Sequence, residues 1–579
     1  MIITTALLLS SALAARPVHA EDDPRTLTYV MAADVDTLDP AWAYDTASLF
    51  VVSSVYETLI AYDGAAVDRF VPRIASVVPT RANGFISKDG LSYAFPLRSG
   101  VKFHDGSRMT PEDVKYSLLR FLLTDREGGP SSLLLQPLLG RGTVLGPGGK
   151  PDPAVFDELD KAVVLEGGAL VLRLKKPFEP LISVLAGFAP VVSRAFTAAG
   201  GGWDGSKAAW TAHWNPAKEK AALYERACGT GPFKLEAWDR ADKRLLLSRN
   251  DAYWRTPAAL SIVRLQTVGR SRDRRGIVMK GEADVVQVER RDLPGFKDVP
   301  GITVDDDTPV MEVQNVILFN LAAAGGENPW LGSGMLDGAG VPPGFFADAE
   351  LRKAFALCFD TDAYIREAYH GRAERARGPI PKGLPGYAAR QAPWPYSLEQ
   401  AAAAFKRARN GEVWEKGFLL PFAYNEGQNE RRLACRILKD GAAKVNPKFR
   451  VDCRPTAQSK LLDEFRARRL PIFVFRWVLD YPDPHNAVQP FLHSKGYFAE
   501  RLGYSNPRAD ELIDSAAVET DPSKRKALYA ELQALAVYDA PQIYTVDASN
   551  ALIRRAKVRG WVSNPIFPYG SLYEVNKTQ

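Results

Sequence analysis

Strand-like and helix-like segments alternate along almost the whole chain, and this alternation constrains the fold more than any other feature of the sequence. Apolar strand-like runs occur at 26–32, 313–320 and 471–479, and helical apolar spacing occurs at 348–359 and 522–538. The alternation of the two patterns predicts mixed α/β layers. Because the chain has 579 residues, far more than one ordinary domain, we expect about three or four domains or lobes.

One helix start is especially clear. Thr110 can cap a helix with its hydroxyl, proline suits position 111, and Glu112 and Asp113 place negative charge in the first turn. An apolar stripe at helical spacing follows it: Val114, Leu118, Phe121 and Leu122. Farther on, residues 124–157 are rich in Gly and Pro, so we expect a loop there.

The N-terminus predicts export. Residues 2–15 are apolar and small, and a Val-x-Ala pattern ends at Ala20, just before an acidic stretch. This pattern is typical of a signal peptide at 1–20 that is cleaved after Ala20. No cysteine lies near the cleavage site and no later apolar run is long enough for a membrane span. We therefore expect an exported, soluble protein without a lipid anchor.

The four cysteines are too few for a disulfide-stapled fold, but an exported chain permits a bridge. Cys435 lies in a helical pattern, and Cys453 lies in the strand-like piece that follows it. A helix and the next strand commonly pack together, so the bridge we predict is Cys435–Cys453. For Cys358, a small buried hydrophobic side chain is favoured over a bridge to Cys228.

Charge and motifs exclude several classes of function. The net charge is only +6, without a long Lys/Arg run interleaved with aromatics, so nucleic-acid binding is not indicated. The chain has no HExxH, Gly-x-Ser-x-Gly, CxxC or P-loop motif. Asp480, Asp483, His485 and His493 are close in sequence, but their spacing disfavours a metal site. A glycosidase pair of carboxylates stays open, because such acids are paired in space rather than in sequence.

The segment FRWVLDYPDPHN, residues 475–486, contains the most informative acid. The apolar strand stops at Asp480, which stands between Trp477 and Tyr481 and is followed by two prolines. Such a carboxylate can receive an ammonium group beside aromatic rings. It can also simply cap the turn before Pro482, and the residues alone favour this second interpretation.

Several short motifs, in order and spread over most of the chain, carry a family resemblance. They include 36–40 (DTLDP), 55–59 (VYETL), 97–106 (LRSGVKFHDG), 109–117 (MTPEDVKYS), 229–233 (GTGPF), 249–254 (RNDAYW), 319–320 (FN) and 351–355 (LRKAF). Together they resemble the solute-binding proteins of ABC importers for dipeptides and oligopeptides. The resemblance implies a two-lobed, type II periplasmic binding protein fold with an extra subdomain. It places lobe I at 21–56, 191–308 and 540–579, the subdomain at 57–190 and lobe II at 309–539.

The resemblance also implies a binding site. In peptide-binding relatives an Asp shortly after a Trp pairs with the α-ammonium of the peptide, and Trp477 and Asp480 match that pattern. The same strand would pair with the ligand backbone, which adds Arg476 and Val478, beside Tyr481. The loop with Asp34 and Asp36 corresponds to the opposite wall.

The implied function is capture of peptides between the lobes and their delivery to an inner-membrane ABC permease, by a monomer without catalysis, metal or cofactor. Two alternatives stay open. One is the same fold with another solute, such as an opine, a sugar or a nickel chelate. The other is an exported hydrolase.

Overall fold

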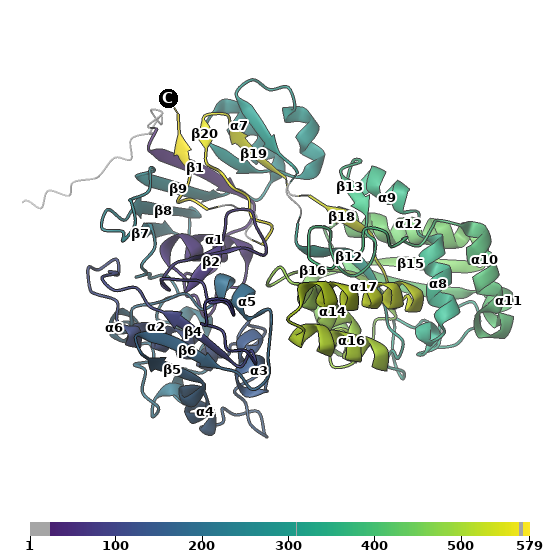
Figure 1. Ribbon diagram of the computed structural model, residues 1–579. Helices are drawn as coiled ribbons and strands as arrows, with labels where there is room; N and C mark the ends of the chain where they lie inside the picture. Colours follow the sequence, from purple (N-terminus) through teal and green to yellow (C-terminus); the bar gives the residue numbers. More distant parts are fainter. Residues whose placement is uncertain (1–23, 308–309, 550, 567–570, 579) are drawn as a thin grey trace, which may run out of the picture.

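The computed structural model describes residues 24–307, 310–549, 551–566 and 571–578. The predicted signal peptide lies outside these residues. Within the described ranges, no helix is both long and apolar enough to cross a bilayer. Figure 1 shows two lobes side by side, each built around its own seven-stranded sheet. We call the lobe that contains the N-terminal strand lobe I and the other lobe II.

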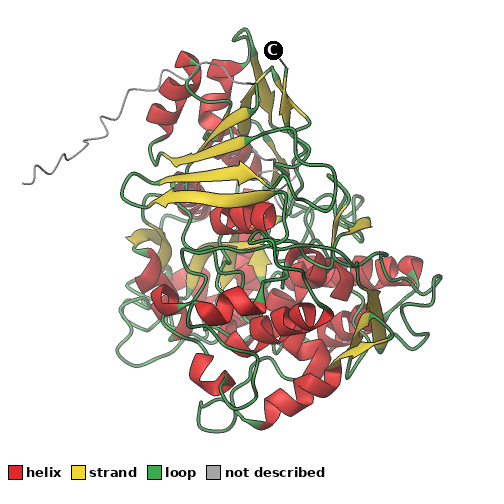
Figure 2. Ribbon diagram, turned by 90° about the vertical axis from the view of Figure 1, so that its left-hand side faces the viewer, coloured by secondary structure: helices red, strands yellow, loops and turns green. Residues whose placement is uncertain are grey.

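The sheet of lobe I is covered on both faces. Tyr29 of the N-terminal strand packs on Phe50 of α1 (Thr46–Val55), whereas Val30 faces a separate cluster that includes Val278 of α7 (Ser271–Lys280). This alternation follows from the two-residue period of a strand. Figure 2 shows the long strands of this sheet lying side by side. In spatial order the strands are β11 (Ile302–Asp305), β19 (Leu552–Arg555), β10 (Val285–Gln287), β1 (Thr26–Met31), β9 (Ile262–Thr267), β8 (Arg244–Arg249) and β7 (Phe233–Asp239).

The sheet of lobe II is also buried between two layers of helices. In its central strand, Ile317 faces the cluster formed with α8, α10 and α12, and Val316 faces the cluster formed with α14, α16 and α17. The strands, in spatial order, are β13 (Ala373–Arg375), β18 (Val546–Ala548), β12 (Glu312–Phe319), β16 (Ile472–Val478), β14 (Phe418–Asn425) and β15 (Phe449–Thr456), with β17 (Gln542–Ile543) beside β12. The helices are α8 (Ala349–Cys358), α10 (Leu398–Arg407), α12 (Asn429–Val445), α14 (Pro484–Leu492), α16 (Pro507–Val518) and α17 (Pro522–Asp539).

Residues 57–190 add small sheets and short helices to lobe I. Their core is continuous with that of the main sheet, because Phe95 and Leu122 belong to the same hydrophobic cluster as Leu27. The elements are β2 (Ile60–Tyr62), β3 (Phe70–Pro72), β4 (Ser92–Pro96), α2 (Pro111–Thr124), α3 (Ser132–Leu139), α4 (Ala154–Ala162), β5 (Val163–Glu166), β6 (Ala169–Arg173) and α5 (Leu181–Gly187).

Within this region one local prediction is confirmed and one is wrong. Helix α2 starts with a capping box, in which Thr110 and Asp113 bond each other's backbone N–H groups. The loop expected at 124–157 instead contains α3 and the start of α4. Buried leucines, among them Leu134 and Leu138, stabilise α3 even though it contains Pro137.

The chain passes between the two main sheets twice, once between β11 and β12 and once between β18 and β19. The second passage corrects one expected boundary. Residues 540–548, assigned from the sequence to the return into lobe I, still belong to the sheet of lobe II, because β17 and β18 pair with β12. The return into lobe I begins with β19, which pairs with β10 and β11.

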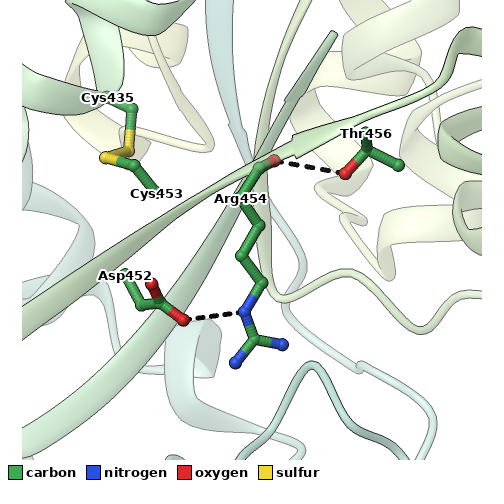
Figure 3. Close-up of a disulfide and its surroundings, with 5 residues drawn as sticks. All are labelled: Cys435, Asp452, Cys453, Arg454 and Thr456. Carbon is green, nitrogen blue, oxygen red and sulfur yellow. Dashed lines mark hydrogen bonds and ion pairs between the residues drawn. A yellow bond between two sulfur atoms is a disulfide. The ribbon is translucent and has the colours of Figure 1, made fainter. Parts of the chain in front are cut away.

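A disulfide joins Cys435 of α12 to Cys453 of β15, the pair selected by the helix-and-strand argument (Figure 3). The two Cα atoms are 6.0 Å apart, a usual separation for a disulfide. Cys228 and Cys358 are free and buried.

Candidate functional site

A cavity of about 970 Å³ lies between the two lobes. Lobe I contributes the start of α1, the loop after α2 and residues 214–215, and lobe II contributes the end of β16 and part of α14. The lobes meet beside the cavity, where the Phe178 and His485 rings lie edge to face with centroids 5.8 Å apart. The Glu179 N–H also donates to the Ala517 carbonyl at 3.2 Å.

Asp480 follows β16, and its partly buried carboxylate lies in the cavity wall. The Tyr44 hydroxyl donates a hydrogen bond to it from lobe I, and the Asn486 side-chain amide donates at 3.2 Å. Among the described residues, no Lys or Arg lies within ion-pair distance of this carboxylate. Burial raises the pKa of Asp480 to about 6, although both hydrogen bonds lower it.

The turn after β16 is capped by a different acid. Asp483 accepts a hydrogen bond from the His485 N–H at 2.8 Å and is the N-cap of α14. Its carboxylate also accepts two hydrogen bonds of 2.8 Å from Arg525. In the described part of the chain, the Asp480 carboxylate accepts hydrogen bonds from two side chains and from no backbone N–H of this turn.

Trp477 and Val478 line the cavity together with Asp480. Strand β16 pairs with β12 along most of its length, but with β14 only at Ile472 and Phe473. On that second edge, residues 474–478 have no strand partner in the described part of the chain. An extended ligand could pair with such an edge.

Arg476 and Tyr481, also predicted from this segment, are not among the described residues that line the cavity. Arg476 is exposed, and its guanidinium lies 3.7 Å from a Glu312 carboxylate oxygen. Tyr481 is buried against the core of lobe I, and its hydroxyl is 3.0 Å from Nδ1 of His485.

The predicted acids of the opposite wall also lie outside the described lining of the cavity. Asp36 forms an ion pair with Lys218 at 2.6 Å. One Asp34 carboxylate oxygen lies 3.2 Å from the Thr267 hydroxyl. Lobe I instead presents Tyr44, from the segment that leads into α1.

Three residues of the lobe I wall, Tyr44, Arg126 and Trp214, are missing from the sequence prediction. Tyr44 precedes Asp45, the N-cap of α1. Arg126 follows Asp125, which ends α2 in a left-handed conformation and turns the chain. Nothing in the local sequence of these residues marks them as part of a site with Asp480, because they lie 436, 354 and 266 residues before it in the chain.

The described residues contain no group of three or more His, Cys, Asp or Glu side chains arranged to hold a metal ion. His485, close to Asp480 in sequence, packs between Tyr481 and Phe178. Burial lowers the pKa of His485 to about 4, so its imidazole is neutral at pH 7.

A cavity between two α/β lobes, with a free strand edge and an acid lacking a cation, has the geometry of a solute-binding site. The family model for bacterial extracellular solute-binding proteins, family 5 (middle region), matches residues 70–499. The chain belongs to this family. This family 5 protein is therefore a solute-binding protein for ABC import and not an enzyme, so the hydrolase alternative is wrong.

Individual relatives are distant but cover nearly the whole chain. The probable D,D-dipeptide-binding periplasmic protein DdpA of Escherichia coli (strain K12) is 25% identical over 561 residues, 95% of this chain and 93% of the relative. Heme-binding protein A of Haemophilus influenzae (strain ATCC 51907 / DSM 11121 / KW20 / Rd) is 23% identical over 535 residues, 90% of this chain and 86% of the relative.

Among solved structures, the periplasmic binding protein DppA from Helicobacter pylori, in complex with peptide STSA, is similar with a TM-score of 0.70. It is 20% identical, and the match covers 96% of this chain and 98% of that chain. This similarity confirms the predicted two-lobed periplasmic binding protein fold.

Proposed function

We propose that this solute-binding protein captures peptides in the periplasm, holds their α-ammonium group on Asp480, and presents them to an inner-membrane ABC permease. The observation that carries the proposal is the Asp480 carboxylate, which lies in the cavity wall with two hydrogen bonds and without a cation partner among the described residues. A ligand ammonium would supply the missing charge. The free edge of β16 supports an extended backbone beside it.

The names of the relatives include both dipeptide and heme ligands, so the acid is the feature that favours a peptide. A buried carboxylate attracts a ligand amine and repels ligand carboxylates. An amine-bearing solute such as an opine remains the main alternative. Native mass spectrometry of the purified protein would separate the two by the mass of the retained ligand.

The direct test is Asp480→Asn, which keeps the shape of the side chain and removes its charge. We expect peptide affinity to fall by on the order of 2–5 kcal/mol, the scale for stranding a buried charge. The measurement is titration calorimetry with free and N-acetylated peptides. Asp34→Asn, outside the described cavity lining, is the matched control. Undiminished affinity in Asp480→Asn would contradict the proposal.

A further inference from the structure

The cavity contains a cation as well as an acid. The charged residues of its described lining are Asp125, Arg126, Glu127 and Asp480. The Asp125 carboxylate is occupied by hydrogen bonds from the hydroxyls of Ser131 and Thr143 and from the backbone of residue 144. The Glu127 side chain is exposed. Besides the exposed Glu127, Arg126 and Asp480 are thus the charges of the lining that are available to a ligand.

Arg126 is held in place without being neutralised. Its guanidinium carbon lies 5.3 Å from the ring centroid of Tyr44 and 5.6 Å from that of Trp42. One of its terminal nitrogens donates to the Glu127 carbonyl at 3.1 Å. Its Nε–H is buried and has no hydrogen-bond partner in the described part of the chain, where no carboxylate lies within ion-pair distance of the guanidinium.

A second unsatisfied donor lies on the adjacent segment. The Asn215 N–H donates to the Thr124 carbonyl at 2.9 Å, and the Glu127 N–H donates to Oδ1 of Asn215 at 3.2 Å. These bonds fasten residues 214–215 to the loop that carries Arg126. Trp214 lines the same cavity, and its Nε1–H is buried without a partner in the described residues. Buried donors normally have acceptors, so a small shift that brings either N–H to the cavity surface would let an acceptor on the ligand satisfy it.

The acid and the cation are close because both contact one side chain. Tyr44 bonds Asp480 through its hydroxyl and supports the Arg126 guanidinium with its ring. With an ordinary hydrogen-bond length, Tyr44 keeps the two charges no more than about 11 Å apart. Each peptide residue spans at most about 3.3–3.6 Å, and the contacts at both ends also take up length. The span fits about two residues and is too short for an extended tetrapeptide.

We propose that Arg126, aided by the Trp214 indole N–H, receives the terminal carboxylate of the ligand while Asp480 receives its ammonium. The preferred ligand is then a short zwitterion of dipeptide size with both termini free. This inference rests on the proposed peptide-binding function and adds the second anchor and the length limit. Arg126 belongs to lobe I and Asp480 to lobe II, so one ligand would link both lobes.

The test uses a mixed dipeptide library, its C-amidated and N-acetylated counterparts, and a tetrapeptide library, measured by thermal shift and calorimetry on the full-length protein. We expect amidation to weaken binding to the wild type at least tenfold. Arg126→Gln should bind free dipeptides with at least tenfold lower affinity than the wild type. It should also bind amidated and free dipeptides equally well. It should still reject N-acetylated dipeptides. Trp214→Phe should reduce the preference for a free carboxylate several-fold, and Arg244→Gln, an exposed arginine of lobe I, should behave as wild type.

The outcomes separate this inference from the proposed function. Equal binding of free and amidated dipeptides by the wild type, or tighter binding of tetrapeptides, overturns the carboxylate anchor while N-acetyl discrimination still supports Asp480. Indifference to both modifications, or no binding of any library, overturns the proposed function as well. Circular dichroism and the melting temperature show whether Arg126→Gln is folded, and Arg126→Lys, which keeps the charge, should recover part of the discrimination.

Discussion

At the scale of single residues, the charge of Asp480 makes ligand binding depend on pH. Its pKa of about 6 without a ligand results from burial, and an ammonium beside it would lower that pKa. Binding should therefore release protons near pH 6 and strengthen as pH rises from 5 to 7.5. Above about pH 8 it should weaken again, as the peptide amine loses its proton.

Calorimetry in buffers of different ionisation enthalpy measures this proton release directly. Asp480→Asn should bind weakly with no inflection near pH 6. Proton uptake by the wild type near pH 6, or an affinity that does not change between pH 5 and 7.5, would contradict the assignment of the ammonium to Asp480.

The Tyr44 hydroxyl should shift the pH at which Asp480 gains or loses its proton. Its hydrogen bond lowers the pKa of Asp480, so Tyr44→Phe should move the midpoint of the pH dependence to a higher pH. Hydrogen bonds to a charged group contribute roughly 1.5–3 kcal/mol, and part of this should appear as weaker binding at pH 7. Tyr497→Phe, which changes a tyrosine of the same cavity that makes no hydrogen bond to Asp480 among the described residues, is the control. An unchanged midpoint in Tyr44→Phe would show that the hydroxyl does not act on Asp480.

The sequence identified one side of the cavity better than the other. Trp477, Val478 and Asp480 could be predicted because they lie close together in one strand and its exit, the segment that the family resemblance points to. Tyr44, Arg126 and Trp214 could not, because they come from three separate segments of lobe I. The unsatisfied donors of Arg126 and Trp214, and the distances between the three residues, exist only after the segments pack together, so no local pattern reports them.

At the scale of elements, the predicted helices and boundaries were confirmed where neighbouring residues alone determine the structure. The capping box of α2 needs only residues 110–113 and is present. The helix α3 was missed because Gly and Pro nearby indicate a loop, whereas tertiary burial of its leucines outweighs that preference. The boundary at 540 was misplaced for a similar reason, since pairing of β17 and β18 with β12 is a long-range contact.

The disulfide between α12 and β15 should contribute stability without affecting the site. It closes a segment with a sequence separation of 18 residues, for which the chain-entropy model gives about 3 kcal/mol. The double variant Cys435→Ala/Cys453→Ala should unfold at lower denaturant concentration and bind ligand as before, because neither cysteine lines the described cavity.

Chemical denaturation with and without a reductant checks this prediction. The reductant should destabilise the wild type and leave the double variant unchanged. If the double variant is as stable as the oxidised wild type, the disulfide does not add to the free energy of unfolding.

At the scale of the whole molecule, the cavity depends on contacts between two lobes that the chain joins between β11 and β12 and between β18 and β19. Residues 57–190 share a core with the main sheet of lobe I, so they move with it. Contacts from this region to lobe II, such as the ring contact between Phe178 and His485, form only when the lobes are together. We expect such contacts to set the balance between open and closed forms, and ligand affinity to reflect that balance.

Phe178→Ala should therefore weaken the binding of every ligand by a similar factor. Phe178 is not among the described residues that line the cavity, and an aromatic pair contributes about 0.5–1.5 kcal/mol, which corresponds to roughly two- to twelvefold in affinity. Free, amidated and acetylated dipeptides should lose affinity equally, in contrast to the selective losses expected for Arg126→Gln. Small-angle scattering should show a more extended ligand-free protein.

Phe156→Ala provides the matched control, because Phe156 contacts Trp203 within lobe I. This variant also removes a phenylalanine ring, but the contact that it removes lies within one lobe. Both variants lose packing in lobe I, so a general loss of stability would weaken binding in both. A loss confined to Phe178→Ala isolates lobe closure, since only this variant removes a contact that the open form lacks. Equal losses in the two variants, or a loss in Phe178→Ala that depends on the ligand's terminal groups, would contradict a role in closure.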